Sequence, residues 1–124
     1  MSSNNIPTDE DFKRAEAADA ERNRGLNEVS VQVLHRFEKN DVHKVFMFYS
    51  QRIDTFGAFI FYRWDKQISE AEKSGLASQI KKAVLEELEN VGRGDCESLR
   101  VDFEFDSHEN VEQNYEGDYC LRLR

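Results

Sequence analysis

The sequence predicts an α+β domain in which helices cover one face of a four-stranded antiparallel sheet. Two observations support this class: strand-like segments occur in two pairs, and a segment with helical spacing of apolar residues precedes each pair. The expected order is therefore α-β-β-α-β-β. A chain of 124 residues is the size of one domain, so we assign residues 1–124 to a single domain with a charged, peripheral helical segment at residues 1–24.

The first expected helix starts near Thr8, a capping residue followed by three acidic residues that suit a helix N-terminus. Residues 12–24 are alanine-rich and charged, with little to bury. After Gly25 an apolar stripe appears at helical spacing, and we expect the helical region to end at Lys39-Asn40-Asp41. We expect one long helix or two helices joined near Gly25. The stripe consists of Leu26, Val29, Val33, Leu34 and Phe37.

The first strand pair is expected at residues 42–51 and 56–64, which are rich in β-branched and aromatic side chains and are separated by a polar turn. Both faces of this hairpin are apolar in places. We therefore expect it to lie at the centre of the sheet or under cover.

The second expected helix begins with a capping box, Ser69 with Glu72, and ends before Gly92 and Gly94. Its apolar residues recur every four positions, as on one face of a helix. They are Leu76, Ile80, Val84 and Leu88.

The second strand pair is expected at residues 99–106 and 119–124. Residues 99–106 alternate apolar and charged side chains, so Asp102, Glu104 and Asp106 share the face opposite Leu99 and its apolar neighbours. Like charges on one sheet face repel, which costs stability and suggests a cationic partner. The surrounding segment, residues 95–118, carries nine carboxylates and one basic residue, Arg100.

The formal net charge of −8, from 25 acidic and 17 basic residues, argues against binding to nucleic acid or to an anionic membrane. The first seven residues contain no signal-peptide pattern, and no stretch is apolar and long enough to span a bilayer. Cys96 and Cys120 form no CxxC pair and are expected to be reduced. We therefore expect a cytoplasmic protein.

Motifs for catalysis or cofactor binding are absent from the sequence: it contains no glycine-rich nucleotide loop, no nucleophile elbow and no metal-ligand spacing. We expect no cofactor, no metal and no enzymatic activity. One alternative stays open, a small enzyme in which His43 or His108 meets a carboxylate as an acid–base pair.

We select the acidic last third as the candidate binding site for a protein partner. Tyr115 is included as an aromatic anchor, because tyrosine is frequent in binding hot spots. The charged members of the set are Asp102, Glu104, Asp106, Glu109, Glu112 and Glu116.

Over residues 26–123 the chain resembles the YezG-type family of bacterial immunity proteins. The resemblance lies in the order of an opening helix, an aromatic hairpin, an acidic helix, a Ser-Leu strand and an acidic aromatic tail. The corresponding segments here are Val45-Phe-Met-Phe-Tyr49 with Phe59-Ile-Phe-Tyr62, Leu76 to Glu89, Ser98-Leu-Arg-Val-Asp-Phe-Glu104, and Asn114-Tyr-Glu-Gly-Asp118. The resemblance implies a role as antidote to a polymorphic toxin or a contact-dependent growth inhibition toxin.

Charge and resemblance together predict an immunity protein that binds and neutralises a cognate toxin domain, with a basic nuclease as the expected toxin. The alternative is a nucleic-acid mimic that inhibits a host defence complex, as anti-restriction and anti-CRISPR proteins do. Carboxylates spaced like phosphates over a curved surface would favour the mimic, whereas one acidic strand and loop favours a compact toxin site.

Overall fold

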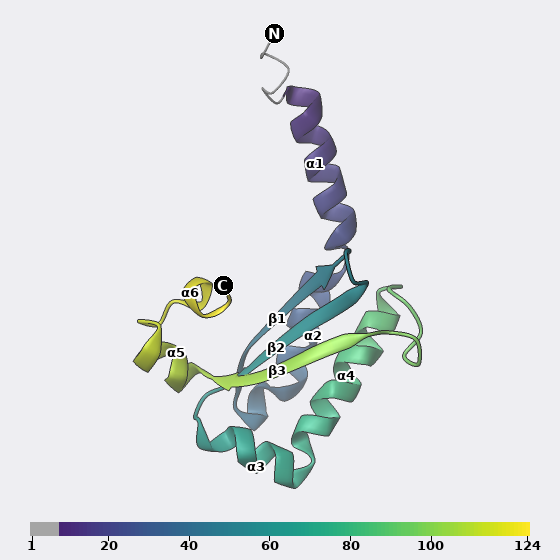
Figure 1. Cartoon of the computed structure of the whole chain (residues 1–124). Coiled ribbons are helices and arrows are strands. Elements are labelled where there is room, and N and C mark those ends of the chain that lie inside the picture. Colours follow the sequence, from purple (N-terminus) through teal and green to yellow (C-terminus); the bar gives the residue numbers. More distant parts are fainter. Residues whose placement is uncertain (1–7) are drawn as a thin grey trace.

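The computed structural model describes residues 8–124. Met1 to Pro7, where we expected no signal peptide, lies outside the described residues. Figure 1 shows a sheet with helices packed behind it. The elements are, in order, α1 (Asp9–Arg22), α2 (Leu26–Phe37), the 3₁₀ helix η2 (Glu38–Asn40), β1 (Val42–Ser50), β2 (Thr55–Tyr62), α3 (Lys66–Ser74), α4 (Leu76–Asn90), β3 (Val101–Ser107), α5 (His108–Asn114) and α6 (Tyr119–Arg122).

The class is α+β, as predicted, but the sheet differs from the expected four antiparallel strands. Within the described residues it has three strands in the order β1-β2-β3, and β2 runs antiparallel to β1 but parallel to β3. The chain between β2 and β3 contains both α3 and α4. A helical crossover of this kind returns the chain to the end of the sheet from which β2 started, so β3 is parallel to β2. Alternating apolar residues predict a strand without predicting its direction.

The expected fourth strand, residues 119–124, is wrong: the structure has the short helix α6 there. Asp118 caps it, because its carboxylate accepts hydrogen bonds from the backbone N–H groups of Cys120 and Leu121. A capping residue directly before the segment favours a helical turn over a strand. The alternation of Tyr119, Leu121 and Leu123 was therefore misleading.

The core lies between one face of the sheet and the helices α2 and α4 (Figure 1). The predicted stripes are confirmed, because Leu26, Val29, Val33 and Phe37 of α2 are all buried, as are Ile80, Val84 and Leu88 of α4. The sheet contributes alternate side chains from each strand, which is the period of two expected for a sheet covered on one face. These include Val45, Met47, Phe56, Ala58, Ile60 and Tyr62, with the half-buried Phe103 and Phe105 beside them.

The N-terminal helix is separate from α2, and the break falls at Gly25. This residue has a φ of 76°, and a Cβ added to it would lie 2.8 Å from the side chain of Val91, so glycine suits both the backbone and the space. Helix α1 begins with Thr8 in a capping box with Asp11, buries none of its side chains and extends away from the sheet (Figure 1). Arg93 braces its C-terminal end by donating hydrogen bonds to the carbonyl oxygens of residues 21, 22 and 24.

The second helical region consists of two helices, α3 and α4, that meet at Gly75 with a φ of 86°. The predicted capping box of Ser69 is wrong, because α3 begins at Lys66 and Ser69 Oγ instead donates to the Lys66 carbonyl oxygen. The side chain of Gln67 accepts a hydrogen bond from the Trp64 N–H, which helps to satisfy the backbone where the helix starts.

Candidate protein-docking face

The face of the sheet opposite α2 and α4 carries aromatic and acidic side chains in three cross-strand rows. We call it the open face. Its rows follow from the strand register, because partners on adjacent strands project from the same side of the sheet. The rows are Phe48–Gly57–Asp102, Phe46–Phe59–Glu104 and Lys44–Phe61–Asp106.

Residues 108–124, which contain α5 and α6, form the C-terminal segment, and this segment covers one end of the open face. The ring of Tyr119 lies 5.4 Å from that of Phe46 and 4.9 Å from that of Phe61, measured between ring centroids. Arg122 lies over the Phe61 ring at 5.8 Å and over the Tyr115 ring at 6.0 Å. In the row that contains Phe61, both Phe61 and Asp106 are buried, whereas Lys44 at its β1 end is exposed.

Arg122 also neutralises part of the predicted acidic row. Its Nε donates to Asp106 Oδ2 and its Nη2 donates to Glu104 Oε1, both at 2.5 Å. Burial lowers the pKa of Arg122, but the hydrogen bonds to these two carboxylates outweigh it and raise the pKa above its ordinary value. Asp106 is buried, so the expected row of three solvent-facing carboxylates is reduced to two.

The other end of the open face remains uncovered. Phe48 is 46% exposed and meets the half-buried Phe59 edge-to-face at 5.7 Å. Asp102 is exposed, and within the part of the chain that the structure describes it forms no ion pair. Glu104 is also exposed, although one of its oxygens binds Arg122. This half of the face therefore combines a large apolar surface with negative charge.

The other predicted site residues lie beyond the end of β3, in the C-terminal segment. Glu109 accepts a hydrogen bond from the Asp65 N–H at 2.9 Å, which ties α5 to the chain that leads into α3. Glu112 contacts His108, and Tyr115 is half-buried beneath Arg122. Glu116 is exposed in the turn between α5 and α6. The structure thus brings Asp102, Glu104 and Asp106 together on one face, and it gives Glu109 and Tyr115 internal contacts.

His43 and His108 form a small polar cluster beside the covered end of the open face. Their ring centroids are 4.3 Å apart. His108 Nδ1 lies 2.6 Å from the Tyr119 hydroxyl oxygen, and its Nε2 lies 2.9 Å from Glu112 Oε1. Burial, reinforced by the charges of Glu112 and Asp106, raises the pKa of Tyr119 to about 12. The hydroxyl is therefore protonated at neutral pH, so it can either donate to His108 Nδ1 or accept from it, according to the tautomer of the ring.

We expect acid to weaken the fold through His43. Burial lowers its pKa, and the positive charges of His108, Arg63 and Lys44 lower it further, against an opposing effect of Glu112. Because the folded state disfavours protonation, the stability contributed by neutral His43 is complete above the ordinary pKa of about 6.5 and is lost as the pH falls below it. One proton changes the free energy of unfolding by at most about 1.4 kcal/mol per pH unit.

The measurement is urea unfolding between pH 7.5 and pH 5.5, for the wild type and for His43→Gln. The variant is expected to lose less stability over this range. His35→Gln is the control, because His35 is an exposed residue of α2, and it should retain the wild-type slope. Equal slopes for wild type and His43→Gln would contradict the assignment.

Neither cysteine is bonded: Cys96 is half-buried and Cys120 is exposed, and both are free thiols. Within residues 8–124, no group of three or more potential ligands is placed to hold a metal ion. The helices in this same range include none that is long and apolar enough to cross a membrane.

Sequence reasoning missed the aromatic part of the open face and the role of Arg122. The signal for the aromatic part was present, because Phe46 and Phe48 alternate with the core residues Val45 and Met47. The sequence predicts that this hairpin lies at the centre of the sheet or under cover. In the structure β2 is the central strand, but β1 is an edge strand. Arg122 left no comparable signal, because its partners lie 16 and 18 residues earlier in the chain.

No family model, no curated protein and no solved structure matches the chain.

Proposed function

We propose that this protein is a non-enzymatic immunity protein that binds a basic toxin domain, a nuclease, and blocks its active surface. The observation that carries the proposal is the uncovered half of the open face, where exposed Phe48 and half-buried Phe59 adjoin the carboxylates of Asp102 and Glu104. A solvent-facing aromatic pair next to an unpaired carboxylate combines an apolar anchor with charge, as protein-binding hot spots do.

Charge would act mainly on the rate of encounter. Nuclease surfaces that hold phosphates are positive, and the chain has a formal net charge of −8. Attraction between opposite charges can raise association rates to about 10⁸ M⁻¹s⁻¹ at low salt. Asp102 is the main local contributor, since Arg122 already compensates Asp106 and part of Glu104.

Aromatic contact would act mainly on dissociation. Phe48 and Phe59 lie on adjacent strands, so the backbone holds them in place before a partner arrives. A rigid apolar anchor loses little conformational entropy on binding. Burial of this pair against a toxin would exclude water from the neighbouring ion pairs and slow their release.

The open face supports this reading better than the nucleic-acid mimic. A mimic needs many carboxylates spaced like phosphates over an extended surface. Here Asp106 is buried in an ion pair with Arg122, and Glu109 accepts a hydrogen bond from the backbone N–H of Asp65. The remaining acidic surface of the sheet is compact, which suits a single toxin site.

The test uses the variable C-terminal domain of the secreted protein encoded next to this chain's gene, purified and mixed with the protein in a stopped-flow instrument. We expect Asp102→Lys to slow association by about tenfold at low salt and by less at high salt. We expect Phe48→Ala to act chiefly on dissociation. Glu16→Lys, the same reversal of charge on α1 far from the open face, should change the association rate much less.

Equal effects of Asp102→Lys and Glu16→Lys would show that only total charge matters and would overturn the site. Absence of a toxin gene next to this one, or absence of binding to its product, would overturn the immunity function.

A further inference from the structure

The free edge of β1 is a second surface that the proposed function does not use. Among residues 8–124, the sheet order β1-β2-β3 gives β1 a neighbouring strand on one side only. An edge strand presents backbone N–H and C=O groups that have no strand partner, and proteins usually protect such edges with charges, bulges or cover.

The two edges of this sheet are protected to different degrees. Strand β3, at the far edge, carries Asp102, Glu104 and Asp106 at alternate positions. Strand β1 has a bulge between Val42 and Lys44, but from Val45 to Ser50 it carries no charged residue. Six residues of edge strand therefore lack the usual barriers against pairing with another strand.

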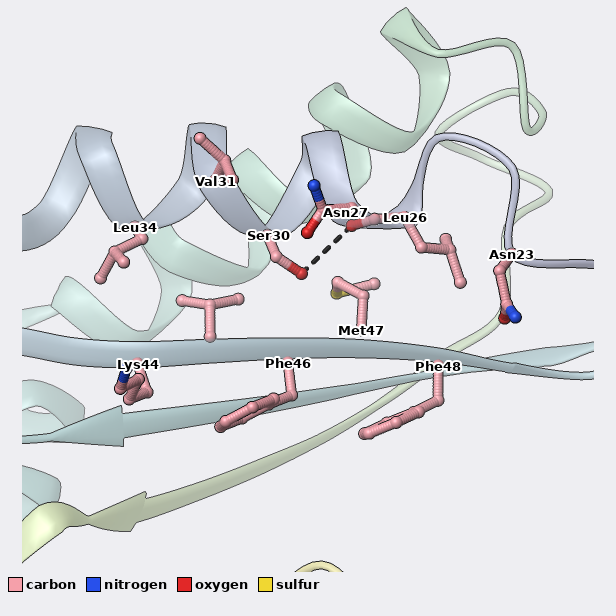
Figure 2. Close-up of a pocket in the computed structure, with 11 residues that line it drawn as sticks. Asn23, Leu26, Asn27, Ser30, Val31, Leu34, Lys44, Phe46, Met47 and Phe48 are labelled. Atoms are coloured by element: carbon pink, nitrogen blue, oxygen red, sulfur yellow. Dashed lines mark hydrogen bonds between the residues drawn. The ribbon is translucent and has the colours of Figure 1, made fainter. Parts of the chain in front are cut away.

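A groove of about 500 Å³ runs beside this edge, between β1 and α2 (Figure 2). Its α2 wall is formed by Asn27, Ser30, Val31 and Leu34, and Met47 projects into it from β1. Val31 is 53% exposed. Lys44 is the one charged residue among those that line the groove, in a chain of which 34% is charged.

We propose that a second copy of this chain adds its β1 antiparallel to this edge, so that two sheets become one sheet of six strands. A twofold axis at Met47 would pair Phe46 with Phe48 and Val45 with Tyr49 of the second copy. Lys44 would lie opposite Ser50, so the two lysines stay at opposite ends of the pairing. Every apolar position in this register meets another apolar position.

The absence of charge argues for a second copy over a foreign partner. A different protein that binds a chain of net charge −8 would be steered to it by opposite charge. The edge strip from Val45 to Ser50 carries no charged side chain that could steer such a partner. Twofold pairing needs no opposite charge, since the same uncharged strip faces itself. The acidic β3 edges would lie at the two ends of the extended sheet, as far apart as the assembly allows.

Dimerisation would also enlarge the open face. In antiparallel pairing, opposite residues share a face, so the open faces of the two copies would lie on the same side. Phe46 and Phe48 of both copies would form a continuous aromatic centre, flanked by the two acidic strands. The dimer is independent of toxin binding, and either proposal can fail without the other.

The test is the molar mass of the purified full chain in solution, by light scattering and sedimentation, from about 1 µM to about 1 mM. We expect the mass to rise from that of a monomer to that of a dimer. Amide hydrogen exchange should show greater protection in β1 as the concentration rises. A mass that remains monomeric up to the highest concentration would overturn the proposal.

Two variants of α2 locate the interface. Val31→Glu places a charge on the wall of the groove, and burying it should raise the dissociation constant of the dimer by about tenfold or more. Gln32→Glu adds the same charge one residue further along the helix, at an exposed position outside the groove, and should dimerise like the wild type. Circular dichroism melting checks that both variants are folded.

A dimer that Val31→Glu leaves intact, or protection that rises in elements other than β1, would place the interface elsewhere and overturn the assignment. Asp102→Lys is expected to leave the dimer intact, because Asp102 lies on β3 at the opposite edge. Its effect on toxin association therefore separates the two proposals.

Discussion

Replacement of Phe61 by alanine is expected to lower the free energy of unfolding by about 3–5 kcal/mol, the range for a fully buried aromatic side chain. Phe61 lies on the central strand and is completely buried, although it projects from the open face. Its ring meets those of Phe46 and Tyr119 edge-to-face, and Arg122 lies above it. Loss of the Phe61 ring would leave a cavity and remove the surface against which Tyr119 and Arg122 of the C-terminal segment pack.

Phe59→Ala is the matched control. Phe59 occupies the same strand and the same face two residues away, but it is half-buried and lies outside the C-terminal cover. Its truncation should cost roughly 1–2 kcal/mol, in line with its smaller loss of buried area. Urea unfolding followed by circular dichroism measures both. Equal losses for the two variants would mean that the C-terminal segment does not pack on Phe61 as the structure has it.

Replacement of Arg122 by methionine is the second variant with a large expected effect. It removes the only ion-pair partner that Asp106 has among residues 8–124 and leaves that carboxylate buried. Removal of one member of a buried pair typically costs 3–5 kcal/mol. The expected loss here is about 2 kcal/mol, because Asp106 keeps hydrogen bonds from Asn110 Nδ2 and from the Ser107 N–H.

The loss should appear first as detachment of the C-terminal segment. Amide exchange in α5 and α6 is expected to accelerate more than exchange in β2 or α4. Arg124→Met is the control, because Arg124 is exposed and its substitution removes the same charge two residues further along the chain. This variant should leave both the stability and the amide exchange unchanged. A uniform loss of protection against amide exchange over the whole chain would contradict the role assigned to Arg122, which is to attach α5 and α6 to β3.

The same variant bears on the proposed function. Without Arg122, the carboxylates of Glu104 and Asp106 lose their internal compensation and the open face becomes more negative. If charge steers a basic toxin to this face, association with the folded Arg122→Met variant should be faster than with the wild type. Slower association would indicate that the C-terminal segment itself contacts the toxin.

Local patterning in the sequence was enough to predict the helices and strands that form the core. The stripe from Leu26 to Phe37 and the stripe that contains Ile80, Val84 and Leu88 are both buried, because a helix that must cover a sheet shows its apolar residues at helical spacing. The alternation in residues 99–106 likewise predicted which side chains of β3 face the core. These features depend on neighbours within a few residues.

Contacts between distant segments decided the rest. The direction of β3 depends on the crossover through α3 and α4, and the exposure of Phe48 depends on β1 being an edge strand. The pairing of Asp106 with Arg122 joins residues that are 16 positions apart. Spacing along the chain cannot reveal these features, because the same local pattern is compatible with several arrangements of the elements, and only the packing of the whole domain selects one of them.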